Sequence, residues 1–125
     1  MENSKFSISV VGNKTGTQWV GEFTVKPMLS HRDEIRRDRI RRELIGPEFG
    51  NPTDHVWNLA VTFSELTVRV VAAPPFWTSN GDGMDLMDTN VVTEVYKKTM
   101  EIEASAAAKI KADAEAATAA LRKEG

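Results

Sequence analysis

The fold is decided by residues 6–25, which read FSISVVGNKTGTQWVGEFTV. Apolar and polar residues alternate along both halves of this stretch, which is the period of two expected for a strand with one buried face. The apolar positions are Phe6, Ile8, Val10, Trp19, Phe23 and Val25. Between the halves, residues 12–16 are turn formers. The pattern predicts a β-hairpin with strands near residues 4–12 and 17–26.

The apolar face of this hairpin needs a cover, because a lone hairpin is marginal in water. The cover is either the chain's own helices or a neighbouring subunit. Gly21 lies between Trp19 and Phe23 on that face. A missing side chain there either marks a bulge or leaves room for another group to approach. Trp19 and Phe23 are therefore candidate partner-binding residues.

A first helix is expected from about Ser30 to Gly46. Ser30 and Asp33 have the spacing of a capping box, in which a hydroxyl and a carboxylate satisfy free N–H groups at a helix start. Gly46 followed by Pro47 is typical of a helix end. Opposite charges four residues apart predict ion pairs along this helix. The expected pairs are Asp33–Arg37, Asp38–Arg42 and Arg39–Glu43.

A second helix is expected over about residues 54–72, because Leu59, Phe63 and Leu66 recur at helical spacing. Its last part, residues 66–71, is rich in β-branched residues and fits a strand as well as a helix.

Phe76 and Trp77 follow two prolines that end the second helix. Either the two aromatic side chains cover the core as a lid, or they are exposed and anchor a partner, as aromatic residues often do. Both are included among the candidate partner-binding residues on the second interpretation.

From about Asn90 the chain is expected to be one helix almost to its end. Roughly 33 residues would form a rod about 50 Å long, more than a domain of this size needs. The first part carries bulky side chains, whereas the later part is mostly alanine, which favours helix but buries little surface. We expect a small α+β domain over residues 1–103, with the hairpin packed on two or three helices, and a projecting helical arm over residues 104–125. Ile110 and Leu121 are the candidate partner-binding residues of the arm.

The composition excludes several classes of function. The 125 residues carry a net charge of −2 and include no cysteine, so disulfides, thiolate nucleophiles and cysteine zinc sites are absent. Apolar runs are far shorter than the roughly 20 residues that cross a bilayer. The common phosphate-loop, zinc-hydrolase and serine-hydrolase signatures are missing, and His31 and His55 have no partners at a catalytic spacing. We expect a protein without enzymatic activity, cofactor or membrane contact.

The arginine-rich segment at residues 31–42 is the strongest polar signal in the chain. Arg32, Arg36 and Arg39 share one face of the expected helix and could hold carboxylates or phosphates by bidentate contacts. Four interleaved acidic residues, Glu43 included, leave about +2 over this segment. Three interpretations stay open: a solvated and internally paired face, an interface for an acidic protein, and, as the weakest, a nucleic-acid site.

Three aspartates are spaced by three residues, at Asp82, Asp85 and Asp88. They could hold Ca²⁺ or Mg²⁺, because hard cations take carboxylate oxygens. They do not match the EF-hand loop. The stronger alternative places Asp82 and Gly83 in a turn and Asp85 or Asp88 at the start of a helix.

Five segments stand in this order along the chain: WVGEFTVK (19–26), LSHRD (29–33), RRELIG (41–46), APPFW (73–77) and GMDLMDTNVVTEVY (83–96). In style and order they resemble small proteins of tailed bacteriophages, some of which are tail assembly chaperones and others morphogenesis or virion components. The resemblance implies a protein made in the cytoplasm of an infected bacterium, where it engages phage structural proteins or becomes part of the virion.

The resemblance predicts a phage morphogenesis protein that acts through protein–protein contacts. The apolar hairpin face, the aromatic pair and the projecting helix support this prediction, because each would be explained by a neighbouring chain. The protein would be a tail assembly chaperone or a minor virion component, working as an oligomer or within a larger assembly. The alternative is a nucleic-acid-binding module that uses the arginine-rich helix at residues 31–42.

Overall fold

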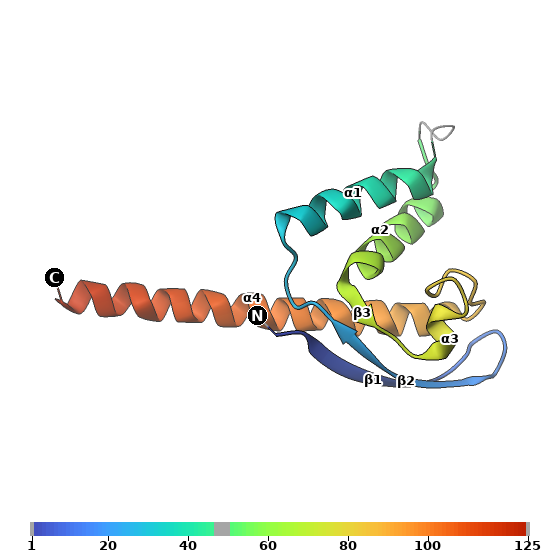
Figure 1. Ribbon diagram of the computed structural model, residues 1–125, viewed down its shortest axis with the longest axis horizontal. Coiled ribbons are helices and arrows are strands. Elements are labelled where there is room, and N and C mark those ends of the chain that lie inside the picture. The colour runs from blue at the N-terminus through green and yellow to red at the C-terminus, as the bar shows by residue number, and fades with distance from the viewer. Residues whose placement is uncertain (1, 47–50, 125) are drawn as a thin grey trace.

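The computed structural model describes residues 2–46 and 51–124. Its elements follow in the order β1 (Ser4–Val11), β2 (Gln18–Val25), α1 (His31–Ile45), α2 (Asp54–Arg69), β3 (Val70–Ala72), α3 (Pro75–Thr78) and α4 (Thr89–Glu124). Figure 1 shows a small body of strands and helices from which α4 projects far to one side. The predicted α+β class, with an N-terminal hairpin and a long C-terminal helix, is confirmed.

The described part of the chain forms one antiparallel sheet in the order β1-β2-β3. The hairpin register places Phe6 opposite Phe23 and Val10 opposite Trp19, so the alternating apolar residues share one face. The two predicted strands are confirmed. β1 ends at Val11 instead of residue 12, and β2 spans Gln18–Val25 instead of residues 17–26. The short β3 pairs with the last residues of β2, next to a register shift between Thr24 and Val25.

The segment at residues 66–71, which fitted either a helix or a strand, divides between the two. α2 continues to Arg69, and β3 begins at Val70, which has an extended backbone with ψ of 117°. Leu66 and Val68 stay helical despite the β-branched composition, because both side chains are buried against neighbouring elements. Val70 leaves the helix to pair with Val25. Tertiary packing therefore overrides the local strand preference up to Arg69.

α1 begins and ends as expected. Ser30 and Asp33 form both hydrogen bonds of the capping box, and Gly46 ends the helix with a positive φ of 83°. The helix stop expected from Pro47 lies outside the described residues.

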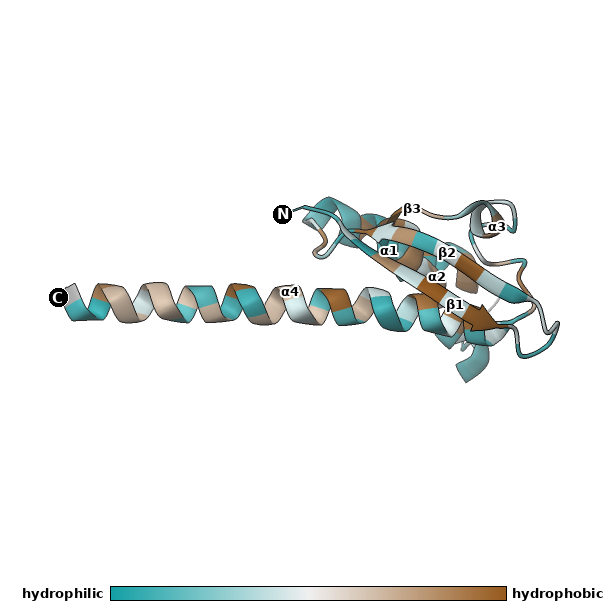
Figure 2. Ribbon diagram, turned by 90° about the horizontal axis from the view of Figure 1, so that it is seen from below, coloured by the Kyte–Doolittle hydropathy of each residue, from teal (hydrophilic) through white to brown (hydrophobic). Residues whose placement is uncertain are grey.

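The sheet, α2, α3 and the first part of α4 enclose one core. Its buried members are Ile8, Phe23, Phe63, Leu66, Trp77, Val91, Val92 and Val95. In Figure 2 the hairpin is seen lying across the helices, with α1 and α2 behind it and α4 alongside β1. The chain's own helices thus cover the apolar face of the hairpin, and of the two covers considered, this is the one observed.

The aromatic pair after the two prolines forms a lid. Trp77 is 1% exposed and meets the edge of Phe23 at a ring-centroid distance of 5.3 Å. Phe76 is half-buried, and its ring centroid lies 5.0 Å from that of Trp19. The interpretation of Trp77 as an exposed anchor is therefore wrong, because the indole can bury its large apolar surface within the chain.

Gly21 leaves room for the approach to this lid. A Cβ atom at Gly21 would lie 2.6 Å from Cγ of Pro74 and 3.2 Å from Cε1 of Phe76. Of the two roles considered for Gly21, close approach of another group is the one observed. The glycine lets the chain that carries the lid lie directly on the hairpin.

We predict that Gly21→Val lowers the free energy of unfolding by about 1–3 kcal/mol, because the added side chain overpacks the contact with Pro74. Urea denaturation followed by tryptophan fluorescence measures the change. Val20→Thr is the control, because Val20 is 60% exposed on the opposite face of β2 and should tolerate the change. Equal midpoints for Gly21→Val and the unmodified protein would show that the contact is not tight.

Candidate interaction surfaces

α1 is attached to the body by ion pairs and by partly buried apolar side chains, of which Leu44 packs against the core. None of its side chains is fully buried. Instead, Glu65 of α2 lies 3.3 Å from Arg37, 3.4 Å from Arg41 and 2.7 Å from Arg69. The Glu65 carboxylate is only 10% exposed, so water screens these contacts less than it screens a surface ion pair. One carboxylate thus holds two arginines of α1 against α2.

The same network extends to α4. Arg69 is 3% exposed and forms a second ion pair with Glu103, in the middle of α4. Nη1 of Arg69 is buried without a hydrogen-bond partner among the described residues. The network therefore links α1, α2 and α4.

The ion pairs expected within α1 are wrong. Asp33 pairs with Lys26 at 3.1 Å, and Arg37 turns to Asp38 and Glu65. The hydrogen bond from Lys26 is the main cause that lowers the pKa of Asp33 below its ordinary value. Lys26 and Glu65, which lie outside the helix, take part because half-buried tertiary contacts are less screened than exposed pairs along a helix surface. In the described part of the chain these pairs do not form: Asp33–Arg37, Asp38–Arg42 and Arg39–Glu43.

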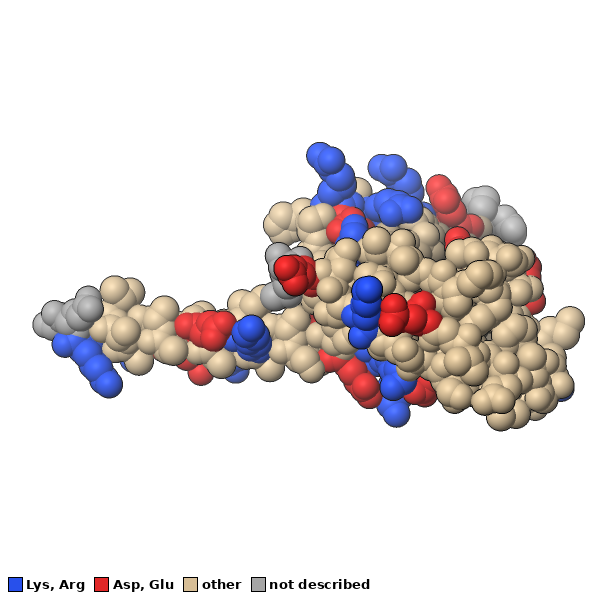
Figure 3. All heavy atoms as spheres, turned by 60° about the horizontal axis from the view of Figure 1, so that its bottom comes forward, with Lys and Arg blue, Asp and Glu red and all other residues tan. Residues whose placement is uncertain are grey.

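This rearrangement leaves a basic surface on the outer side of α1. Arg32, Arg36, Arg39 and Arg42 are exposed, and none has an ion pair within residues 2–46 and 51–124. Ile35 lies among them and is 61% exposed. We call these five residues the α1 arginine face. Figure 3 shows basic side chains standing out along the upper rim of the molecule, over α1. Of the two other arginines, Arg37 pairs with Asp38 within the segment, as the internally paired interpretation expected, and Arg41 pairs with Glu65 of α2 instead.

The second surface is the projecting part of α4. All side chains from residue 107 to residue 123 are exposed, and Ile110 and Leu121 are 45% and 70% exposed. Ile110, Ala114, Ala117 and Leu121 follow one another at steps of four, three and four residues, so they share one side of the helix. We call this stripe the arm stripe. Val92 and Val95, which are buried, begin the same side of the helix, so the arm stripe continues the core-facing side beyond the body.

The aromatic candidates lie differently. Phe23 and Trp77 are 0% and 1% exposed, so they have no surface to offer a partner, which corrects their place among the partner-binding residues. Trp19 and Phe76 are half-buried. The indole N–H of Trp19 donates to Asp88 at 2.8 Å, so its polar atom has an internal partner.

Asp88 is a structural residue rather than a cation ligand. Its side chain is fully buried and accepts four hydrogen bonds from the hairpin: from the backbone N–H of Lys14 and of Thr15, from Oγ1 of Thr15 and from Nε1 of Trp19, at 2.6–2.8 Å. The Thr15 hydroxyl is the main cause that holds the pKa of Asp88 far below its ordinary value. Both carboxylate oxygens are therefore already used.

The turn expected before Asp88 is present. Asp82 has a positive φ of 53° and Gly83 a φ of 91°. Asp88 directly precedes α4, and its carbonyl accepts from the N–H of Val91 at 3.1 Å, but its side chain serves the hairpin instead of the helix. Within the described residues, no three acidic or histidine side chains come close enough to hold a metal ion.

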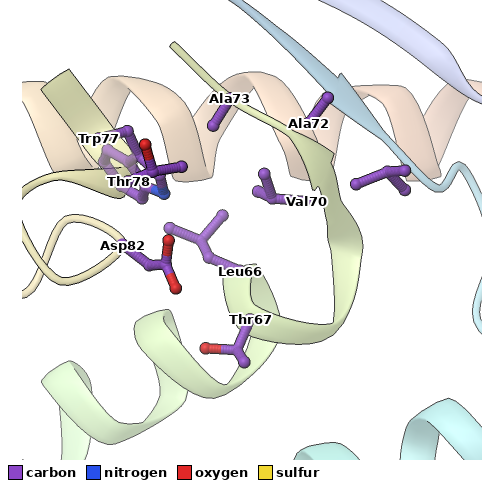
Figure 4. Close-up of a pocket in the computed structure, with 9 residues that line it drawn as sticks. Leu66, Thr67, Val70, Ala72, Ala73, Trp77, Thr78 and Asp82 are labelled. Carbon is purple, nitrogen blue, oxygen red and sulfur yellow. The ribbon is translucent and has the colours of Figure 1, made fainter. Parts of the chain in front are cut away.

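The described surface has hollows that the sequence did not predict, and two of them lie against core residues. The first, of about 320 Å³, lies beside β3. In Figure 4 Leu66 and Val70 line its apolar side, and the Asp82 carboxylate points toward Leu66. Asp82 is the one ionisable group among the described residues that line it. This hollow therefore lacks the paired groups that acid–base or nucleophilic catalysis requires.

The second hollow, of about 580 Å³, is an apolar groove between α2 and the loop before α4. Leu59, Met84 and Met87 line it and are 40%, 54% and 71% exposed. Flexible methionines on a surface suit contacts with varied apolar groups. The sequence signal was the pair of methionines in a polar loop, but their alignment with Leu59 depends on the fold.

We predict that Asp88→Asn lowers the melting temperature at pH 7, because an amide cannot accept all four hydrogen bonds. The pKa of Asp88 is lowered in the folded state, so its stabilisation is present above the ordinary value of 3.8 and is lost as the pH falls below it. The difference in melting temperature between Asp88→Asn and the unmodified protein should therefore shrink toward about pH 2. Calorimetry measures it, with the exposed Asp82→Asn as control; a constant difference at all pH values would refute the role of the charge.

We predict that Glu65→Gln lowers the free energy of unfolding by about 3 kcal/mol, the lower end for a broken buried pair, because Arg37 and Arg41 keep part of their hydration. Urea denaturation measures this loss. Glu101→Gln, at an exposed position of α4, is the matched control. If both substitutions cost the same, Glu65 does not hold the arginines of α1.

Comparison with protein-family models, with curated proteins and with solved structures finds no match to this chain. Among residues 2–46 and 51–124, no helix is long and apolar enough to cross a membrane. The function has to be inferred from the chain's own surfaces.

Proposed function

We propose that this protein is a non-enzymatic assembly protein that binds other protein chains through its projecting helix. The carrying observation is the exposure of every side chain from residue 107 to residue 123, in a helix whose first half completes the core. An isolated helix of about this length is marginal in water. A contact with a partner therefore explains this exposed part of the helix better than the stability of the body does.

The arm stripe suits a protein partner. Ile110 and Leu121 supply the larger apolar contacts, about 16 Å apart along the helix axis. Ala114 and Ala117 between them let the backbone of a neighbouring chain approach closely, and packing contributes in proportion to the apolar area covered. The contact would add a helix or groove of another protein to the side of α4 that already faces the core.

The resemblance to small proteins of tailed bacteriophages supplies the setting. We propose that the partners are phage structural proteins in the cytoplasm of an infected bacterium. The protein is then either a tail assembly chaperone, which leaves before the particle is complete, or a minor virion component. Mass spectrometry of purified particles separates the two roles, because only a virion component is retained.

We predict that deletion of residues 104–125 leaves the body folded but abolishes co-purification with phage structural proteins from infected cells. The point variant Ile110→Ser with Leu121→Ser should cause the same loss in the full chain, because it removes the larger apolar groups of the arm stripe. The matched control is Ala108→Ser with Ala119→Ser, on the opposite side of the same helix.

Circular dichroism and thermal melts check that the variants fold. A deletion that unfolds the body would refute the division at residue 103. Normal co-purification of the Ile110→Ser, Leu121→Ser chain would refute the arm as the contact.

A further inference from the structure

Charge is distributed unevenly between the outer side of α1 and the rest of the molecule. The α1 arginine face carries four arginines. The exposed Glu43 lies on the same side of the helix, so this side carries a net charge of +3. The chain as a whole carries −2, so the remainder carries −5. An anionic partner is attracted to this one helix and repelled by most of the other surface.

The α1 arginine face is held in a fixed place without using its own arginines. The capping box at Ser30 and Asp33 begins the helix, Gly46 ends it, and Glu65 binds Arg37 and Arg41 on its inner side. The outward guanidinium groups are thus free of the ion pairs that position α1. The inner side of α1 contributes the half-buried Leu44 to the core, whereas the arginines of its outer side are exposed.

We propose that the α1 arginine face binds an acidic amphipathic helix of a partner protein. Arg32, Arg36 and Arg39 are spaced by four and three residues, so their Cα atoms span about 10 Å along the axis. Carboxylates at the same spacing on a facing helix lie at the same intervals. Each guanidinium can take a carboxylate by two parallel hydrogen bonds.

Ile35 distinguishes this partner from a nucleic acid. It is 61% exposed among the arginines, and an apolar side chain of the facing helix would remove it from water. A phosphate backbone offers Ile35 no such contact. The basic surface is also confined to one helix of 15 residues, whereas the negative remainder of the molecule would repel an extended polyanion.

This inference rests on the proposed function in one respect, namely that the protein acts by binding other chains. It concerns a different surface from the arm stripe. Loss of one contact therefore does not require loss of the other.

The experiment uses the full-length protein and a fluorescent helical peptide with glutamates at positions i, i+4 and i+7 and a leucine between them. Fluorescence anisotropy at physiological salt should show binding that Arg36→Gln with Arg39→Gln weakens about tenfold or more. The matched control, Lys5→Gln with Lys97→Gln, removes the same charge from exposed positions elsewhere and should change the affinity less than about twofold. Ile35→Ser should weaken peptide binding and leave the melting temperature unchanged.

Three outcomes overturn the inference: no binding of the peptide, equal weakening by the arginine and lysine pairs, or tighter binding of a single-stranded or duplex oligonucleotide than of the peptide. The last outcome would favour the nucleic-acid module instead. The Ile110→Ser, Leu121→Ser chain is tested beside them and should bind the peptide normally. If it does so and still captures no phage protein, the α1 inference stands; if the peptide fails while the arm still captures its partner, the proposed function stands alone.

Discussion

The buried carboxylate of Asp88 is the contact on which the arrangement of the body depends. It lies just before α4 and accepts hydrogen bonds from the turn of the hairpin, more than 70 residues away along the chain. Gly12 belongs to the same contact, because a Cβ atom there would collide with the Asp88 carboxylate. Asn90 accepts a hydrogen bond from the backbone N–H of Asn13 and donates one to the carbonyl of Val11. The start of α4 is thereby fixed to one end of the sheet, and the direction of the whole helix follows.

A second polar network controls the opposite side of the molecule. Glu65 and Arg69 lie within α2, yet their partners are on α1 and α4. α1 buries no side chain completely, so these charges add to the apolar contact of Leu44 in fixing its place. Such a network specifies orientation well, because removal of one partner leaves another charge poorly hydrated.

The molecule thus separates the elements that form the core from the elements that present surface. The sheet, α2, α3 and the first part of α4 contain the buried aromatic and aliphatic side chains. α1 and the end of α4 contribute little to that core and expose arginines in one case and an apolar stripe in the other. The molecule therefore presents two surfaces of different chemistry on a small body, one basic and one apolar.

Local features of the chain were decided by the sequence alone. The alternation in residues 6–25 predicted the hairpin, Ser30 and Asp33 predicted a helix start, and the alanine-rich tail predicted a long helix, because these signals depend on neighbours within a few residues. The tertiary structure decided the contacts between residues that are far apart in the sequence. In the folded chain Arg37 and Arg41 pair with Glu65, Trp77 is buried, and the Asp88 carboxylate accepts hydrogen bonds from the hairpin. The sequence contains every charge in α1, but only the fold brings Glu65 near enough to divide them into a bound inner side and a free outer side.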